Sequence, residues 1–240
     1  LLNVPVVDAV IHLAAIANPR ECDINPAKAY LVNVHGTWNV LELARKSGAH
    51  KFVFSSSAHV YGIPPQMLPT GEEAPLQPQS CYTLTKILGE ELCKLYWQTH
   101  RLSYTVLRLF NTYGPGQGPG YFVPDMIAKA TCGPIELLGG NITKDFVYVE
   151  DVARAFVKAL DNHVSATFNI GSGYEVTLRG VAVEIARQHG VSFVFGLDLP
   201  GTRMCADISF ARSVLGWEPQ VNLQEGLNAT IAAAYKTVPV

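Results

Sequence analysis

A tyrosine and a lysine lie four residues apart, at Tyr82 and Lys86, in the stretch SCYTLTK. Residues at positions i and i+4 are neighbours on a helix surface, so this lysine would lie beside the phenol. An unperturbed phenol titrates near about pH 10, and a nearby cation favours its ionised form. Tyr82 is therefore a candidate base, with Lys86 as its cationic partner and as a donor to a ribose. Taken alone, the pattern is more typical of a tyrosine packed beside a solvated lysine.

Three serines follow a predicted strand in the stretch KFVFSSSAHVYG. Ser55, Ser56 and Ser57 would lie at the carboxyl end of that strand, where open α/β sheets build their sites. A hydroxyl group there can bind a substrate oxygen and share a proton with a tyrosine. The alternative is a polar turn, where serine is common.

Three further stretches contain small or polar residues that could contact a ligand. Two of them, HLAA and RLFNTYG, follow or end predicted strands. Ala14 and Ala15, in HLAA, would let a cofactor approach the backbone, whereas His12 is expected to be a packed core imidazole. Asn33, in NVHGTWN, could bond to a cofactor or face a loop. Asn111, in RLFNTYG, could read a phosphate or a sugar, or simply belong to a turn.

The elements that would position these residues alternate between strands and helices. Short apolar runs near residues 6–15, 51–57 and 102–110 predict buried strands, and helical spacing predicts helices over 27–47 and 82–100. This order predicts an α/β fold, a Rossmann-like doubly wound parallel sheet, for residues 1–113. Shorter elements predict a smaller α/β substrate lobe for residues 114–240, with the chain crossing back near 144–170.

Composition excludes several classes of protein. The 240 residues carry a net charge of −2, which argues against nucleic acid as a partner. We find no apolar run long enough to span a membrane and no secretory signal pattern at the start. The five cysteines are scattered without a CxxC pair, which predicts reduced thiols, no metal site and a cytoplasmic protein.

The motifs form an ordered set along nearly the whole chain: HLAA, NxxGT, SSxxVYG, YxxxK, RxxNxYGP, DFVYVxDVA, NIGSG, DxSxA and LGWxP. Together they resemble the extended short-chain dehydrogenase/reductase family, the NAD-dependent epimerase/dehydratase group that acts on nucleotide sugars. The resemblance implies Tyr82 as catalytic base, Lys86 as its partner and Ser57 as the third catalytic member. It also implies NAD as cofactor, with contacts from Ala14, Ala15, Asn33, Ser55, Tyr82 and Lys86.

The chain departs from the family pattern in three places. The family opens with a strand and a glycine-rich GxxGxxG turn that holds the cofactor pyrophosphate, and this chain begins at what resembles a later strand, so a fragment with weakened NAD binding is expected. Lys144 stands where the family has the arginine of its RDF motif, and Arg203 is a second candidate for the substrate diphosphate or a surface arginine. Ala58 and His59 replace the acidic residues of the family's dehydratases, a form that fits the epimerases best.

These residues predict a nucleotide-sugar epimerase that acts at C4 of a UDP-hexose through a 4-keto intermediate. Ser57, Asn111, Lys144 and Arg203 are its predicted substrate contacts. Two alternatives stay open: an NAD(P)H-dependent reductase of a 4-keto nucleotide sugar, and an inactive nucleotide-sugar-binding remnant. The resemblance further implies a homodimer through the helices at 27–47 and 82–100.

Overall fold

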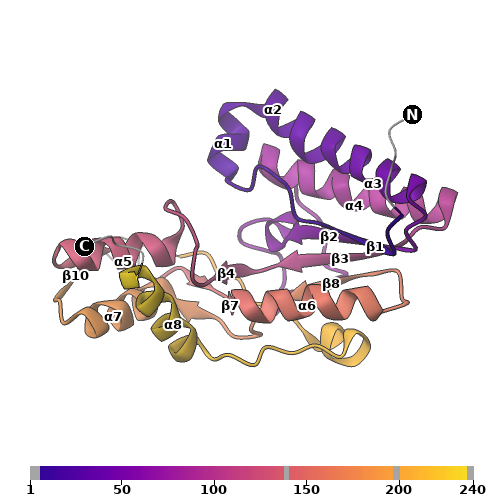
Figure 1. Cartoon of the computed structure of the whole chain (residues 1–240). Helices are drawn as coiled ribbons and strands as arrows, with labels where there is room; N and C mark the ends of the chain where they lie inside the picture. The colour runs from indigo at the N-terminus through magenta and orange to yellow at the C-terminus, as the bar shows by residue number, and fades with distance from the viewer. Residues whose placement is uncertain (1–5, 138–140, 197–200, 237–240) are drawn as a thin grey trace.

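Four strands pair in parallel into the main sheet, in the order β1-β2-β3-β8 (Figure 1). The computed structural model describes residues 6–137, 141–196 and 201–236. The strands are β1 Ala9–His12, β2 Lys51–Ser57, β3 Ser103–Leu109, β4 Asn111–Tyr113, β5 Ile135–Leu137, β6 Thr143–Lys144, β7 Phe146–Tyr148, β8 Ala166–Ile170, β9 Val176–Thr177 and β10 Phe193–Phe195. The helices are α1 Pro19–Ile24, α2 Pro26–Tyr30, α3 Gly36–Lys46, α4 Cys81–His100, α5 Phe122–Cys132, α6 Val149–Asp161, α7 Leu178–His189 and α8 Leu223–Lys236.

Helices cover both faces of the main sheet. α3 and α4 pack on β1, β2 and β3 from one side, and α6 packs on β2 and β3 from the other (Figure 1). β2 and β3 are buried along most of their length, as expected for parallel strands that helices cover on both faces. This arrangement confirms the predicted Rossmann-like, doubly wound α/β fold.

The helix α4 is the element that carries the tyrosine and the lysine. Ser80 caps its first turn in a capping box with Thr83, and the chain leaves it at Arg101 in the left-handed conformation, φ 58°. Gly89 brings α4 close to β2, because a Cβ atom there would collide with the ring of Phe54. The sequence at this point fixes how closely the helix approaches the sheet.

The second lobe contains the short strand pairs β4–β7, β5–β10 and β6–β9. A separate apolar cluster joins α5, α7 and α8 over these strands. The segment β7–α6–β8 then returns to the first sheet, where β8 pairs with β3. The division of the chain at residue 113 stays a prediction.

Local details differ from the sequence predictions. The helix predicted over 27–47 is α2 and α3 joined by a π-helical turn at Leu31–His35. The helix α1 was not predicted, although Asn18 caps it and Pro19 begins it, which is a typical start signal. This short helix carries Cys22 against Tyr82.

Three further findings concern the described residues only. The five cysteines are unpaired. No group of His, Cys, Asp and Glu side chains could hold a metal ion. None of the described helices combines the length and the apolar character needed to cross a membrane.

Candidate active site

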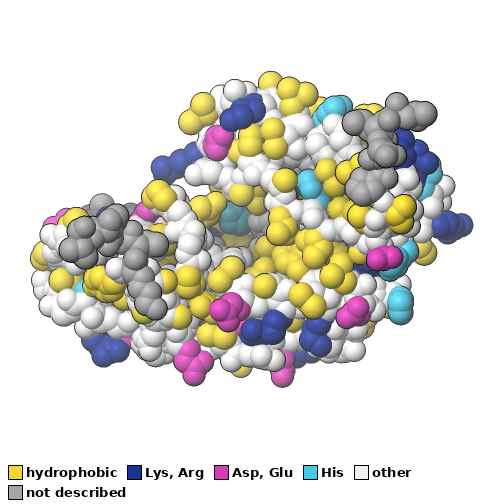
Figure 2. Space-filling model, in the orientation of Figure 1, with side chains coloured by type: hydrophobic (Ala, Val, Ile, Leu, Met, Phe, Trp, Pro, Cys, Tyr) yellow, Lys and Arg dark blue, Asp and Glu magenta, His cyan; other side chains and the backbone are white. Residues whose placement is uncertain are grey.

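A cavity of about 450 Å³ lies at the carboxyl ends of β1, β2 and β3 and is closed by residues of the second lobe. It is seen as the hollow between the two parts of the molecule in Figure 2. The polar and charged side chains that line it come from both halves of the chain: Ser55, Ser56, Ser57, His59, Tyr82, Lys86, Asn111, Thr112, Tyr113, Gln117, Tyr121 and Lys144. The fold therefore brings the predicted catalytic residues and two of the predicted substrate contacts into one place.

Tyr82 lies in the first turn of α4 and is 8% exposed. Burial raises the pKa of its phenol to about 12, and a hydrogen bond with Ser57 opposes that rise. The nitrogen Nζ of Lys86 lies 5.8 Å from the centroid of the Tyr82 ring. Burial has a larger effect than the hydrogen bond, so the free phenol keeps its proton near neutral pH. The i, i+4 spacing to Lys86 had predicted that the ionised form would be favoured.

Lys86 reaches from α4 to the end of β2. Its Nζ donates a hydrogen bond to the carbonyl oxygen of Ser55 at 2.7 Å and lies 5.2 Å from the ring centroid of Phe54. Burial lowers the pKa of Lys86 to about 8. The side chain is consequently mainly cationic near neutral pH and holds one strand end against the helix.

Ser57 begins a short 3₁₀ helix, Ala58–Tyr61, and its Oγ accepts a hydrogen bond from the backbone N–H of His59 at 3.2 Å. His59 meets the Tyr82 ring edge-on, with the ring centroids 6.2 Å apart. Burial, with a smaller effect from Lys144, lowers the pKa of His59 to about 4. This imidazole is therefore neutral near pH 7. Its contact with the ring of Tyr82 was not predicted from the sequence.

Asn111 and Lys144 face the cavity from the second half of the chain. Asn111 donates to the carbonyl oxygen of Asp145 at 3.2 Å, and Lys144 Nζ lies 3.4 Å from the sulfur of Met204. Burial lowers the pKa of Lys144. The described residues that line the cavity include these lysines and no carboxylate, so its charge suits an anionic ligand.

The buried carboxylate of Asp145 anchors the segment that carries Lys144. It accepts hydrogen bonds from the backbone N–H groups of Ser172, Gly173 and Ala206 at 2.5–3.0 Å. The DF pair of the motif was the only sequence signal for this role. Because Asp145 follows Lys144 directly, these hydrogen bonds also hold the backbone that carries the lysine.

Two of the predicted cofactor contacts, Ala14 and Asn33, do not line this cavity. Ala15 lines the cavity, whereas Ala14 is exposed and does not. The amide of Asn33 is buried and bonds to both the N–H and the C=O of Ile16, at 2.8 and 3.0 Å. Asn33 therefore fixes the loop after β1.

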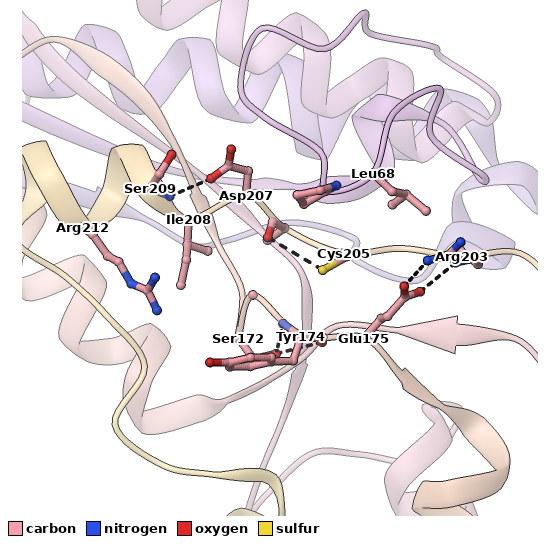
Figure 3. A pocket seen from close by; sticks show the side chains of 13 residues that line it. Leu68, Ser172, Tyr174, Glu175, Arg203, Cys205, Asp207, Ile208, Ser209 and Arg212 are labelled. Carbon is pink, nitrogen blue, oxygen red and sulfur yellow. Dashed lines mark hydrogen bonds and ion pairs between the residues drawn. The ribbon is translucent and has the colours of Figure 1, made fainter.

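Arg203 lies in a second cavity, away from Tyr82. Figure 3 shows its guanidinium facing the carboxylate of Glu175, with which it forms an ion pair. The side chain of Arg203 is also 59% exposed. The structure thus groups Lys144 with the predicted catalytic residues and leaves Arg203 outside that group.

Known proteins are similar to this chain in sequence. The model of the NAD dependent epimerase/dehydratase family matches residues 3–171. A protein of Methanocaldococcus jannaschii named "Putative UDP-glucose 4-epimerase" is 38% identical over 96% of this chain and 78% of its own length. UDP-glucuronic acid decarboxylase 1 of Xenopus tropicalis is 34% identical over 94% of the chain and 56% of its own length.

A solved structure has a similar fold. The UDP-glucose 4-epimerase of Thermotoga maritima, with UDP-glucose, superposes with a TM-score of 0.90 at 32% identity, covering 97% of this chain and 78% of that one. The site is compatible with the cofactor of the family, because the small side chains of Ala15 and Ala17 line the same cavity as Tyr82 and Lys86 and leave room beside them. The extent of the family match, with this fold and this site, shows that the chain belongs to the NAD-dependent epimerase/dehydratase family.

Proposed function

We propose that the chain is a nucleotide-sugar epimerase that inverts C4 of a UDP-hexose through a 4-keto intermediate. The convergence of Ser57, Tyr82 and Lys86 with Asn111 and Lys144 on one cavity carries this proposal. NAD supplies the acceptor and donor of the C4 hydride when it is bound. The similarity to proteins named as UDP-glucose 4-epimerases supports the choice of position and of nucleotide.

The residues of the chain divide the work between proton transfer and binding. Tyr82 takes the proton of the sugar 4-hydroxyl group and later returns it, as a general base and acid. Ser57 shares a hydrogen bond with that phenol and would bind the same sugar oxygen. Lys86 holds the end of β2 and, since it lines the same cavity, would donate to a ribose bound there.

The lysine in the second half of the chain binds the other end of the substrate. Lys144 is the cation that faces the cavity from the second half of the chain, in the part that the structure describes, and Asn111 lies beside it. A diphosphate would replace the weak contact of Lys144 with Met204 by charge-assisted hydrogen bonds. Binding is thereby separated from proton transfer, which falls to Tyr82.

The direct test is to incubate the chain with UDP-glucose and NAD and follow the sugar by proton NMR. Formation of UDP-galactose with no net change in absorbance at 340 nm is the expected result, because an epimerase regenerates its cofactor. Steady consumption of NAD(P)H with a 4-keto sugar would replace this function by the reductase. Release of carbon dioxide from UDP-glucuronic acid would replace it by decarboxylation.

We further propose a homodimer through α3 and α4. These helices pack on each other and expose large apolar side chains: Trp38, Leu43, Leu84, Leu95 and Trp97. Figure 2 shows hydrophobic side chains along the upper edge of the molecule, over α2 and α3. Apolar side chains gathered on neighbouring helices are typical of an interface between copies.

A further inference from the structure

A buried ion pair lies directly behind the catalytic residues. Glu90, on α4, is fully buried, and Arg108, on β3, is 4% exposed. The guanidinium donates to both carboxylate oxygens, from Nε at 3.0 Å and from Nη2 at 2.7 Å. Taking two charges out of water costs several kcal/mol per ion, and their attraction often only offsets that cost. Stability alone therefore explains such a pair poorly.

The pair reaches the catalytic strand end from two directions. Ser56 lies between Ser55 and Ser57, and its Oγ donates to Glu90 Oε1 at 2.5 Å. Arg108 donates to the hydroxyl group of Tyr61 at 2.8 Å, at the end of the 3₁₀ helix that Ser57 begins. Ser57 is consequently held on both of its sides by groups bound to one ion pair.

Side chains of the helix α4 are hydrogen-bonded to two successive residues of β2. Lys86 donates to the carbonyl oxygen of Ser55, and Glu90, one turn further along the helix, accepts from Ser56. Because Tyr82 lies one turn before Lys86, these two contacts fix the phenol relative to Ser57. A shift of the helix would separate the two groups that must share a proton.

We propose that the Glu90–Arg108 pair is a positioning device for the active site: it locks the end of β2 to α4 and keeps Lys86 in its cationic form. The inference concerns the site of the proposed function. A kinetic test of it rests on that function, whereas a titration of Lys86 in the chain without ligand does not.

The charged and titratable groups around Lys86 support the electrostatic part. Burial lowers the pKa of Lys86 to about 8, and Cys22 and Glu90 oppose that fall. The pKa of Cys22 is raised, mainly by burial, and that of His12 is lowered to about 4 by burial, so both are neutral near pH 7. Tyr82 also keeps its proton. Of these groups, Glu90 is the one that forms an ion pair, with Arg108.

The experiment measures the titration of Lys86 by NMR in lysine-labelled chain without ligand, with the signal assigned through Lys86→Met. The variant Glu90→Gln should lower the pKa of Lys86 by about one unit, a tenfold change in its proton affinity. The double variant Glu90→Gln/Arg108→Met removes both charges at similar volume, so it should fold even where the single variant does not. It should lower the same pKa.

Glu91→Gln is the matched control, since Glu91 is exposed and pairs with Lys94 on the solvent side of the same helix. It should leave the titration of Lys86 unchanged. In the kinetic arm, the basic limb of kcat/KM should move to lower pH in the Glu90 variants and stay in place in the control. A folded double variant in which Lys86 titrates as in the parent chain would overturn the inference. Absence of turnover in the parent chain would instead reject the proposed function and leave the titration result standing.

Discussion

The phenol of Tyr82 illustrates how burial and charge compete at a single residue. Spacing in the sequence predicted a tyrosine activated by Lys86, but burial raises the pKa of Tyr82 to about 12. In the structure, a hydrogen bond with the side chain of Ser57 opposes this rise in pKa. The imidazole of His59 also contacts the edge of the Tyr82 ring. For Tyr82 to act as the proposed base, it would have to lose this proton when ligands bind, and the positive charge of bound NAD would favour that loss.

Replacing Tyr82 by phenylalanine removes the proton acceptor and keeps the ring that fills the pocket. We expect Tyr82→Phe to lower kcat by about 10²–10⁴-fold, the range that general acid–base groups contribute. The Kd for the UDP-sugar should change little, because Lys144 and Asn111 remain. Stopped assays by NMR and calorimetry of binding measure the two quantities, and turnover at the parent rate would refute the role of Tyr82.

The second prediction at this scale concerns the diphosphate. Lys144→Ala should weaken UDP binding about 10- to 100-fold, since a hydrogen bond to a charged group contributes about 1.5–3 kcal/mol. Arg203→Ala is the matched control, because Arg203 is paired with Glu175 in the other cavity. Calorimetry with UDP alone gives both affinities. Equal losses in the two variants would show that both cations bind the nucleotide.

At the scale of elements, the long segments were predictable and the short ones were not. The helix α4 and the strands β2 and β3 follow from strong periodicity and apolar runs. The π-helical turn at residues 31–35 and the helix α1 could not be predicted from periodicity, because each spans less than two turns and depends on its neighbours. The site followed the same rule: residues at strand ends were found, and contacts between distant segments were not.

Asn33 shows the limit most clearly. The sequence suggested that Asn33, within the helix predicted over 27–47, could contact a cofactor. In the structure its amide is bonded to Ile16 and to the hydroxyl group of Thr85 at 3.0 Å. Only the fold brings these residues, far apart in sequence, together. A polar residue near a site can serve the loop that forms the site.

The contact between β1 and the following helical segment gives a prediction about pH. His12 Nε2 lies 3.0 Å from Thr37 Oγ1, and burial, with a smaller effect from Lys86, lowers its pKa from 6.5 to about 4. The unfolded chain therefore binds the proton first as the pH falls. The free energy of unfolding should decrease between about pH 6.5 and pH 4, by up to about 3 kcal/mol from this residue.

Urea unfolding at several pH values measures this effect in the parent chain and in His12→Gln, which can still donate to Thr37. The variant should lose the part of the pH dependence that His12 contributes and keep a comparable part from His59, whose pKa is also lowered to about 4. Superimposable pH profiles for the two proteins would contradict the assignment to His12.

At the scale of the whole molecule, the proposed dimer can be tested through the exposed faces of α3 and α4. Trp38 is 44% exposed and Trp97 is 37% exposed. Introducing charge at both, as Trp38→Glu/Trp97→Glu, should convert a dimer into a monomer, because a buried carboxylate without a partner is costly in an interface. Light scattering after size exclusion gives the mass. Val157→Glu on α6, which is 60% exposed on the opposite face, is the control and should stay dimeric.

The cavity at the carboxyl ends of the strands is lined from Leu13 to Met204, and this has a consequence for protein synthesis. A ribosome completes Ser57, Tyr82 and Lys86 early and makes Leu178 and Met204, which close the cavity, much later. Domains fold as their residues emerge from the ribosome. A chain whose translation stops between Lys86 and Leu178 therefore carries the proposed proton-transfer residues in an incomplete cavity. Retention on an immobilised UDP ligand would thus separate completed molecules from stalled ones during translation.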